Sequence, residues 1–92
     1  MISVARELEV LRQRAKELLE EARASAAAAW EAAAEAYRLF MEDDEEEALS
    51  GFWGAVTYAS VAVRCYEDLL AVIGELLRRN DAEGALQAIG NG

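Results

Sequence analysis

The segment EDDEEE, residues 42–47, decides the fold, because it interrupts an otherwise regular helical pattern. Continuing the upstream apolar spacing through this segment would place two acidic residues on the apolar stripe and would miss Leu49. Asp44 and Glu47 have the spacing of a capping box, and acidic side chains stabilise the start of a helix but oppose its end. We therefore predict a tight turn at about 42–45. No glycine or proline enforces it, so one continuous helix is the alternative.

Upstream of the turn, apolar or small side chains recur at alternating spacings of four and three residues, as on one face of an amphipathic helix. These residues are Val4, Leu8, Leu11, Ala15, Leu18, Ala22, Ser25, Ala29, Ala32, Ala36 and Leu39. Ser3 precedes the stripe and is a candidate N-cap. We expect one long helix over about 3–42.

Downstream of the turn, the same alternation runs through Leu49, Phe52, Val56, Ala59, Val63, Tyr66, Leu70, Ile73 and Leu77. It predicts a second helix over about 45–79 that packs on the first through this stripe. Asn80 and Glu83 have capping-box spacing, and Gly90 is a candidate terminator, so a short third helix is expected over about 81–89. The predicted fold class is all-α: one domain over residues 1–92, a long antiparallel helical hairpin with a short C-terminal helix. On self-association it would form a helical bundle.

The composition argues against most catalytic chemistry. A chain of 92 residues allows one small domain, which leaves little room for a large active-site cleft. Histidine is absent, and there is one cysteine and one lysine, so the usual side chains of catalytic and metal sites are missing. We predict that the protein is not an enzyme and needs no cofactor or metal.

The charge of the chain argues against some classes of partner, and its N-terminal residues and single cysteine indicate where it is located. A net charge of −9 argues against nucleic acid and anionic membranes, which attract clustered cations. Residues 48–63 are uncharged, but this stretch is shorter than the roughly 20 residues that span a bilayer. The N-terminal residues lack the pattern of a signal peptide, and one cysteine cannot close a disulfide within the chain. We therefore predict a cytoplasmic protein.

The half of the hairpin next to the turn carries the candidate functional residues. Both helices are apolar there on more sides than one neighbouring helix can cover, so a further surface must cover them. We predict that this half binds a second copy of the chain, as a homodimer, or another protein. The predicted surface consists of Trp30, Tyr37, Phe52, Trp53, Gly54, Thr57, Tyr58 and Val61. Among these, Gly54 and Val61 are expected to lie opposite the contact between the helices.

Two other functions remain open. The aromatic side chains near Trp30 and Trp53 could wall a pocket for a small apolar ligand. The acidic run 42–47 could instead mimic nucleic-acid phosphates and inhibit a basic partner. Quenching of tryptophan fluorescence by apolar molecules would favour the first, and steeply salt-dependent binding to a basic protein would favour the second.

Two resemblances bear on function and origin. Trp30 and Tyr37, seven residues apart, and Ala48 and Ala55 after the turn are similar to a tetratricopeptide-type helix-turn-helix unit. NDAEGAL at 80–86 is similar to the turn and second-helix start of another such unit. This resemblance implies a peptide-binding or scaffolding role. The regular heptads and the absence of proline also resemble a computationally designed bundle, whereas mid-helix glycines and eight arginines to one lysine fit a natural sequence better.

Overall fold

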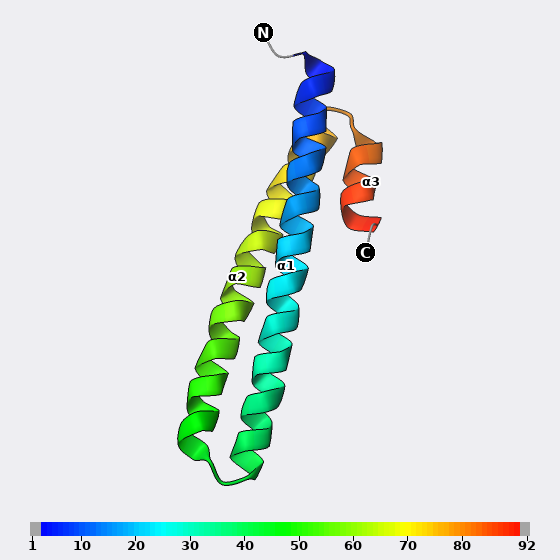
Figure 1. Cartoon of the computed structure of the whole chain (residues 1–92). Helices are drawn as coiled ribbons and strands as arrows, with labels where there is room; N and C mark the ends of the chain where they lie inside the picture. Colours follow the sequence, from blue (N-terminus) through cyan, green and yellow to red (C-terminus); the bar gives the residue numbers. More distant parts are fainter. Residues whose placement is uncertain (1–2, 91–92) are drawn as a thin grey trace. The chain divides into compact units, whose positions relative to one another are not determined.

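The computed structural model describes residues 3–90, which form three α-helices (Figure 1). Helix α1 spans Val4–Met41, α2 spans Glu45–Arg78 and α3 spans Ala82–Gly90. The two long helices form an antiparallel hairpin, and α3 is the short C-terminal helix. The predicted fold class is confirmed, and the alternative of one continuous helix is wrong.

The chain divides into two compact units. Unit 1 combines the start of α1 with the end of α2 and α3, in the described parts of Met1–Glu20 and Cys65–Gly92. Unit 2 is the turn-proximal part, Glu21–Arg64. Whether residues 1–92 fold as one domain stays a prediction.

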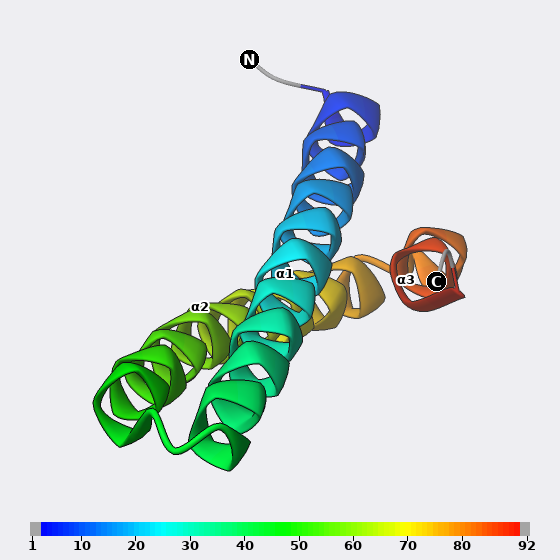
Figure 2. The same ribbon diagram turned by 60° about the horizontal axis from the view of Figure 1, so that its bottom comes forward.

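The turn of unit 2 ends α1 and caps α2 within a few residues (Figure 2). Asp43 adopts the left-handed conformation, with φ of 64°. The N–H of Asp43 donates to the carbonyl of Phe40 at 3.1 Å, and that of Asp44 donates to Leu39 at 3.0 Å. These are the two hydrogen bonds of a Schellman motif. The Asp44 carboxylate then accepts a long hydrogen bond of 3.4 Å from the N–H of Glu47, so the predicted cap is confirmed.

The link between α2 and α3 repeats this backbone motif. Asn80 is left-handed, with φ of 61°, and the N–H of Asp81 donates to the carbonyl of Leu76 at 2.8 Å. Asp81 is the N-cap of α3, because its carboxylate accepts the N–H of Gly84 at 3.1 Å. The predicted capping box of Asn80 and Glu83 is therefore wrong by one residue. Asn80 instead fills the left-handed position, which asparagine tolerates better than most residues.

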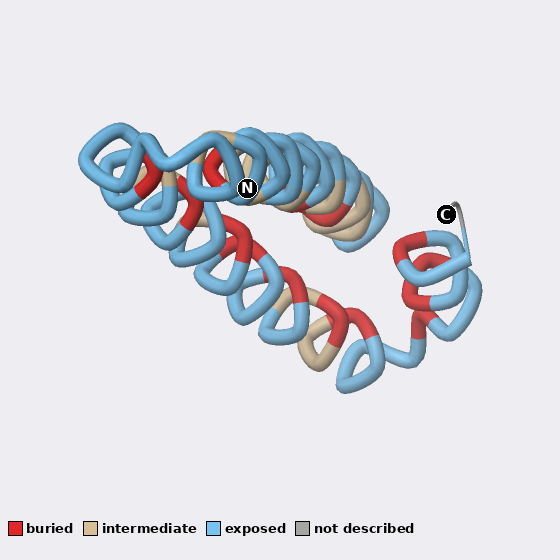
Figure 3. The backbone as a smooth tube through the Cα atoms, turned by 90° about the horizontal axis from the view of Figure 1, so that it is seen from below, coloured by how far each residue is buried: buried red, intermediate tan, exposed pale blue. Residues whose placement is uncertain are grey.

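Unit 1 has a core to which all three helices contribute. Leu18 of α1 and Leu76 of α2 are 2% and 0% exposed, and α3 packs on this core through Ala85 and Ala88. Figure 3 shows the buried positions of α3 on its side toward the other helices. The full cluster is Ala15, Leu18, Leu69, Ile73, Leu76, Ala85 and Ala88, with Leu8, Leu11, Leu19 and Val72 packed against it. Unit 1 therefore has large aliphatic side chains at its centre.

A bidentate ion pair joins α3 to α1 in unit 1. The Arg12 guanidinium donates from Nε and Nη2 to the two carboxylate oxygens of Asp81, at 2.8 and 2.6 Å. Asp81 is buried, which by itself raises its pKa, yet the hydrogen bonds from Arg12 and from the Gly84 N–H lower that pKa overall. A β-carbon at position 84 would overlap the Asp81 carboxylate and press on Arg12, so a larger residue there would displace this ion pair.

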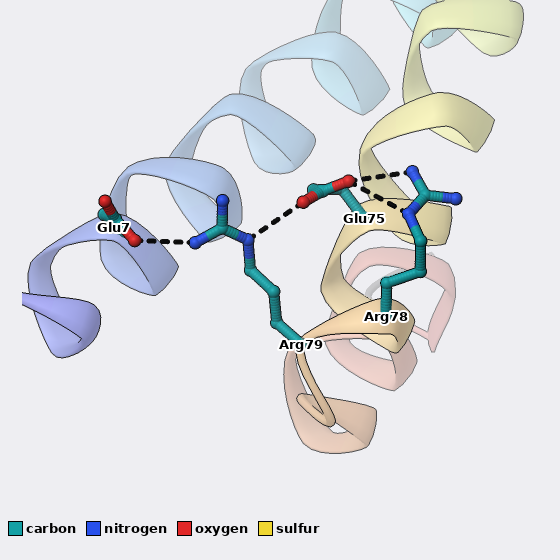
Figure 4. Close-up of polar contacts among 4 residues, drawn as sticks. All are labelled: Glu7, Glu75, Arg78 and Arg79. Carbon is teal, nitrogen blue, oxygen red and sulfur yellow. Dashed lines mark hydrogen bonds and ion pairs between the residues drawn. The ribbon is translucent and has the colours of Figure 1, made fainter.

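A second charged network fixes the end of α2 beside the start of α1 in unit 1 (Figure 4). Arg79 donates to Glu7 of α1 at 2.7 Å and to Glu75 at 3.0 Å, while Arg78 donates to Glu75 at 2.8 Å. Hydrogen bonds from Arg78 and Arg79 lower the pKa of Glu75. Such solvent-exposed pairs contribute little stability individually.

Unit 2 has a much thinner core, formed by two helices. Across residues 21–64, all of which the structure describes, every buried residue is an alanine. These are Ala22, Ala36, Ala48, Ala55 and Ala62. A β-carbon built on Gly51 of α2 would lie 2.9 Å from the β-carbon of Ala36 of α1. The two backbones therefore approach closely at this point, and small side chains make that approach possible.

On α1, the predicted contact stripe is confirmed from Leu8 to Leu39, where each of its residues is buried or half-buried. On α2, the predicted stripe is wrong by one residue except at Ile73, which is buried as predicted. Leu49 and Val56 are 62% and 53% exposed, and the buried positions of α2 are Ala48, Ala55, Ala62, Cys65, Leu69, Ile73 and Leu76. One residue is about 100° around a helix.

The error on α2 has a physical cause. The helix carries two neighbouring stripes with the same heptad spacing, one of small residues and one of large residues. In unit 2 the alanine-rich side of α1 accepts the small stripe, because Ala48, Gly51 and Ala55 allow close packing that large side chains would prevent. The large stripe is left on the surface.

Candidate interaction surface

All eight residues of the predicted surface lie in unit 2, and six of them are exposed. Trp30 and Trp53 are 78% and 71% exposed, and Tyr37 is 61% exposed. Phe52, Thr57 and Tyr58 are also exposed. Large aromatic side chains are usually buried for most of their area, so several exposed ones in one unit are an unusual feature.

Gly54 and Val61 are the two exceptions, since both are half-buried. Their predicted place opposite the helix contact is wrong, because the contact stripe of α2 is rotated by one residue. Both residues instead flank that stripe on its other side. A β-carbon at Gly54 would meet nothing within 4 Å, so this glycine is not required for packing within the chain.

Heptad register shows which exposed residues share a side of the hairpin. We letter each helix a to g, with a at Ala22 and Ala36 on α1 and at Ala48 and Ala55 on α2, all of them buried. In an antiparallel pair, position e of one helix lies on the same side as position e of the other, and position b adjoins it. On this side, α1 carries Trp30, Tyr37 and Phe40, and α2 carries Leu49, Phe52, Val56 and Val63, with Trp53 adjoining at f. We call these eight residues the apolar face.

Unit 1 shows how position e is covered when a third helix is present. Leu19 at position e of α1 packs against the cluster that contains α3, and Ile73 at position e of α2 belongs to that cluster. Arg12, also at e, binds Asp81. In unit 2, by contrast, Phe40 and Phe52 at position e are 51% and 38% exposed. Position e is thus covered at Leu19 and Ile73, where α3 contributes to the cluster, and exposed at Phe40 and Phe52 of unit 2, as it is at Tyr66 of unit 1, which is 40% exposed.

Four members of the apolar face were missing from the predicted surface: Phe40, Leu49, Val56 and Val63. Leu49, Val56 and Val63 had been assigned to the helix contact, since large aliphatic residues at heptad spacing normally form a core. One sequence signal could have placed these three residues on the surface. Each of them directly follows a small residue, and those small residues form a second stripe with the same heptad spacing. Phe40 lies beside the stripe of α1, one position after Leu39.

The opposite side of α1 in unit 2 is polar. Arg38 donates two hydrogen bonds to Glu42, at 2.7 and 2.8 Å, and also binds Glu35 on its other side. The hydrogen bond from Arg38 lowers the pKa of Glu35. These residues occupy positions c and g, so charge is kept on the side away from the apolar face.

Two aliphatic hydroxyl groups near the apolar face form hydrogen bonds within their own helix. Thr57 donates from Oγ1 to the carbonyl of Trp53 at 3.0 Å, and Ser60 donates to the carbonyl of Val56 at 2.8 Å. Each of these two hydroxyls therefore donates its hydrogen bond within α2. The uncharged stretch of α2 consequently offers a partner mainly apolar surface.

Two open depressions occur elsewhere, along the start of α1 in unit 1. One is lined by Ser3, Ala5, Arg6, Leu8, Glu9 and Arg12, and the other by Arg6, Glu9, Val10, Gln13, Arg14 and Glu17. Neither includes a residue of the predicted surface. Within residues 3–90, no group of three or more metal-binding side chains is arranged around a common point. In the same residues, no helix is long and apolar enough to cross a membrane.

Comparisons of this chain with protein-family models, with curated proteins and with solved structures found no match. The class that the structure itself defines is an all-α helical hairpin with a short third helix. Conclusions about function therefore depend on the chemistry of the surface.

Proposed function

We propose that the protein is a non-enzymatic self-association module, in which two copies pair through the apolar face of unit 2. The main supporting observation is that unit 2 buries its small side chains and exposes its large ones, the reverse of the usual arrangement. Alanines are buried across residues 21–64, while large side chains such as Trp30, Trp53 and Leu49 are exposed. Burying the large residues against another surface would supply the hydrophobic free energy that this half lacks.

The exposed area is large enough for a dimer. A fully exposed aromatic side chain presents about 150–250 Å². With exposures of 78%, 61%, 38% and 71%, the side chains of Trp30, Tyr37, Phe52 and Trp53 together present about 500 Å². The aliphatic members of the face add to this total. A stable interface buries about 800 Å² from each partner, so the face supplies most of what one copy needs to contribute.

The chemistry of the face favours a protein partner over a small ligand. Residues 48–63 carry no charge, and the Thr57 and Ser60 hydroxyls are already bonded to their own helix. A small-molecule site generally needs a few polar groups that converge on the ligand and orient it. A helix from a second copy needs only complementary apolar surface.

A peptide-binding role, as the tetratricopeptide resemblance implies, has less support. Helices α1 and α2 contain 38 and 34 residues, so either is about as long as a complete helix-turn-helix repeat of that family. A designed origin and a cytoplasmic location remain predictions from composition. Neither changes the expected behaviour of the apolar face.

The direct test places a charge in the proposed interface. In Val56→Glu, an unpaired carboxylate would be buried on association, which disfavours the dimer strongly. We expect the wild type to sediment as a dimer and Val56→Glu as a monomer, with association weakened at least about a hundredfold. Sedimentation velocity over a range of concentrations measures this.

The matched control is Leu70→Glu. Leu70 lies two heptads after Val56 at the same position and is 69% exposed, but it belongs to unit 1. We expect this variant to remain dimeric. A wild type that is monomeric at high concentration would contradict self-association and favour a ligand or a basic protein as partner. Dissociation by Leu70→Glu in place of Val56→Glu would move the interface to unit 1.

A further inference from the structure

Helix α3 makes few large apolar contacts with the rest of unit 1. Its buried residues are Gly84, Ala85 and Ala88. Its two large side chains, Leu86 and Ile89, are 69% and 63% exposed. Burying such small residues removes little apolar area from water, and a helix of nine residues is shorter than the roughly 12–15 that persist alone in water. The polar contacts of α3 should therefore decide whether it stays docked.

The strongest polar contact of α3 is the bidentate ion pair between Arg12 of α1 and the buried carboxylate of Asp81. The other hydrogen bond to this carboxylate comes from the N–H of Gly84, so it lies within α3 and survives undocking. A buried carboxylate that loses its cationic partner is strongly destabilised. Undocking of α3 relieves this cost, because water then solvates the carboxylate. Loss of the pair should thus release α3 and leave the hairpin folded.

From these contacts we infer that α3 is a releasable cover, which the Arg12–Asp81 pair holds over one side of unit 1 and which keeps that side from binding a second copy. Leu19 and Ile73, at position e of the two long helices, lie in or against the cluster that α3 completes. At position e in unit 2, Phe40 and Phe52 are exposed and belong to the proposed interface. The inference rests on the proposed function for the identity of the partner, and it adds a means of limiting association to unit 2.

The first experiment removes the cation that holds α3. Arg12→Gln is compared with Arg79→Gln, because both arginines pair with a carboxylate of another helix or its cap in unit 1 and are 38% and 37% exposed. Glutamine adds no apolar surface at either site. We expect the amides of α3 to exchange with solvent at least about tenfold faster in Arg12→Gln than in Arg79→Gln. Amides of α2 near Leu76 report in the same sample that the hairpin stays folded, and equal exchange rates in α3 would overturn the inference.

A double variant separates the ion pair from the packing of the arginine side chain. In Arg12→Gln/Asp81→Asn no buried charge is left without a partner, and asparagine still serves as an N-cap. We expect its α3 amides to exchange within about threefold of the wild-type rate. Exchange as fast as in Arg12→Gln alone would contradict the ion pair as the contact that holds α3.

The second experiment releases α3 without removing either charge. Alanine favours a helix more than glycine does, so Gly84→Ala and Gly90→Ala should both favour the helical state of α3 itself. A β-carbon at position 84 would overlap the Asp81 carboxylate and lie 2.8 Å from Nε of Arg12, whereas one at Gly90 would meet nothing within 4 Å. We expect α3 to exchange at least about tenfold faster in Gly84→Ala and no faster in Gly90→Ala. Slower exchange in Gly84→Ala would mean that helix propensity outweighs the pair, and would overturn the inference.

The role of α3 as a cover is tested by association. Sedimentation velocity over a range of concentrations should show Arg12→Gln and Gly84→Ala associating at least about tenfold more tightly than their controls, or as larger species. Release of α3 with unchanged association would contradict the covering role. A monomeric wild type would contradict the proposed pairing through unit 2. In that case, association gained only by the two releasing variants would still support α3 as a cover of unit 1.

Discussion

Units 1 and 2 are built from the same two helices with the same heptad spacing, yet their cores differ. Unit 1 buries Leu18, Leu69 and Leu76 and adds α3, while unit 2 buries alanines and leaves its large side chains outside. Hydrophobic stabilisation scales with the apolar area removed from water, and a buried alanine removes little. We infer that unit 1 provides most of the stability of the isolated chain, and that unit 2 is the part suited to recognition.

The largest effect should come from truncating the core of unit 1. Leu76 is 0% exposed, so Leu76→Ala leaves a cavity and should lower the free energy of unfolding by about 2–5 kcal/mol. Chemical denaturation followed by circular dichroism measures this. The matched change in unit 2 is Leu49→Ala, which removes the same atoms from a side chain that is 62% exposed.

The two leucine variants should separate stability from association. At a concentration where the protein is monomeric, we expect Leu49→Ala to change the free energy of unfolding by less than about 0.5 kcal/mol. In the dimer, the same variant should weaken association. Equal losses from both variants in the monomer would contradict the division of roles between the units.

Much of the fold could be predicted from sequence because its signals are local. The left-handed Asp43 and the Asp44 cap follow from short polar side chains beside a helix end, and neither needs knowledge of distant contacts. The contact side of α2 could not be predicted in this way. Both of its stripes have heptad spacing, so the choice depends on how closely α1 approaches at Ala36, which is a property of the folded pair.

The candidate surface was predicted in part for the same reason. Trp30, Tyr37 and Trp53 lie off the predicted stripes of both helices, and a one-residue rotation does not bury them. Gly54 and Val61 were misplaced because their position depends directly on that rotation. The ion pair of Arg12 and Asp81 had no signal in the sequence, because its members are 69 positions apart.

The next largest effect should distinguish the two turns, which share a backbone motif. Asp44 caps α2 in unit 2 and is exposed, so Asp44→Ala should cost about 0.5–2 kcal/mol of unfolding free energy. Asp81→Ala should cost more, because Asp81 is buried, caps α3 and also binds Arg12. Denaturation of the two variants in parallel measures the difference. Equal costs would mean that the ion pair contributes nothing beyond the cap.

The same carboxylate should make stability depend on pH. Arg12 lowers the pKa of Asp81 in the folded state below its value of about 3.9 in the unfolded chain. The contribution of Asp81 is therefore fully present above that unfolded value and is lost as the pH falls through the lower folded value. Melting temperatures between about pH 5 and pH 2 should fall less steeply in Asp81→Asn than in the wild type. An unchanged slope would contradict the assigned pKa shift.

The smallest effects should come from two glycines in unit 2, and they should have opposite signs. In a helix, replacing glycine with alanine gains about 0.5–1 kcal/mol when the new methyl group fits. At Gly54 a β-carbon meets nothing within 4 Å, so Gly54→Ala should stabilise the monomer by that amount. At Gly51 the β-carbon would lie 2.9 Å from that of Ala36, so the helices must separate, which costs about 1–3 kcal/mol.

The net result for Gly51→Ala should be a loss of about 1 kcal/mol, because the packing cost exceeds the gain in helix propensity. The two sites are three residues apart on α2 and both are half-buried, so their helical surroundings are nearly the same. Chemical denaturation of the monomer gives both signs in one experiment. If both variants were stabilised, the close approach at Ala36 would not exist, and the small stripe of α2 would no longer explain why the large stripe is exposed.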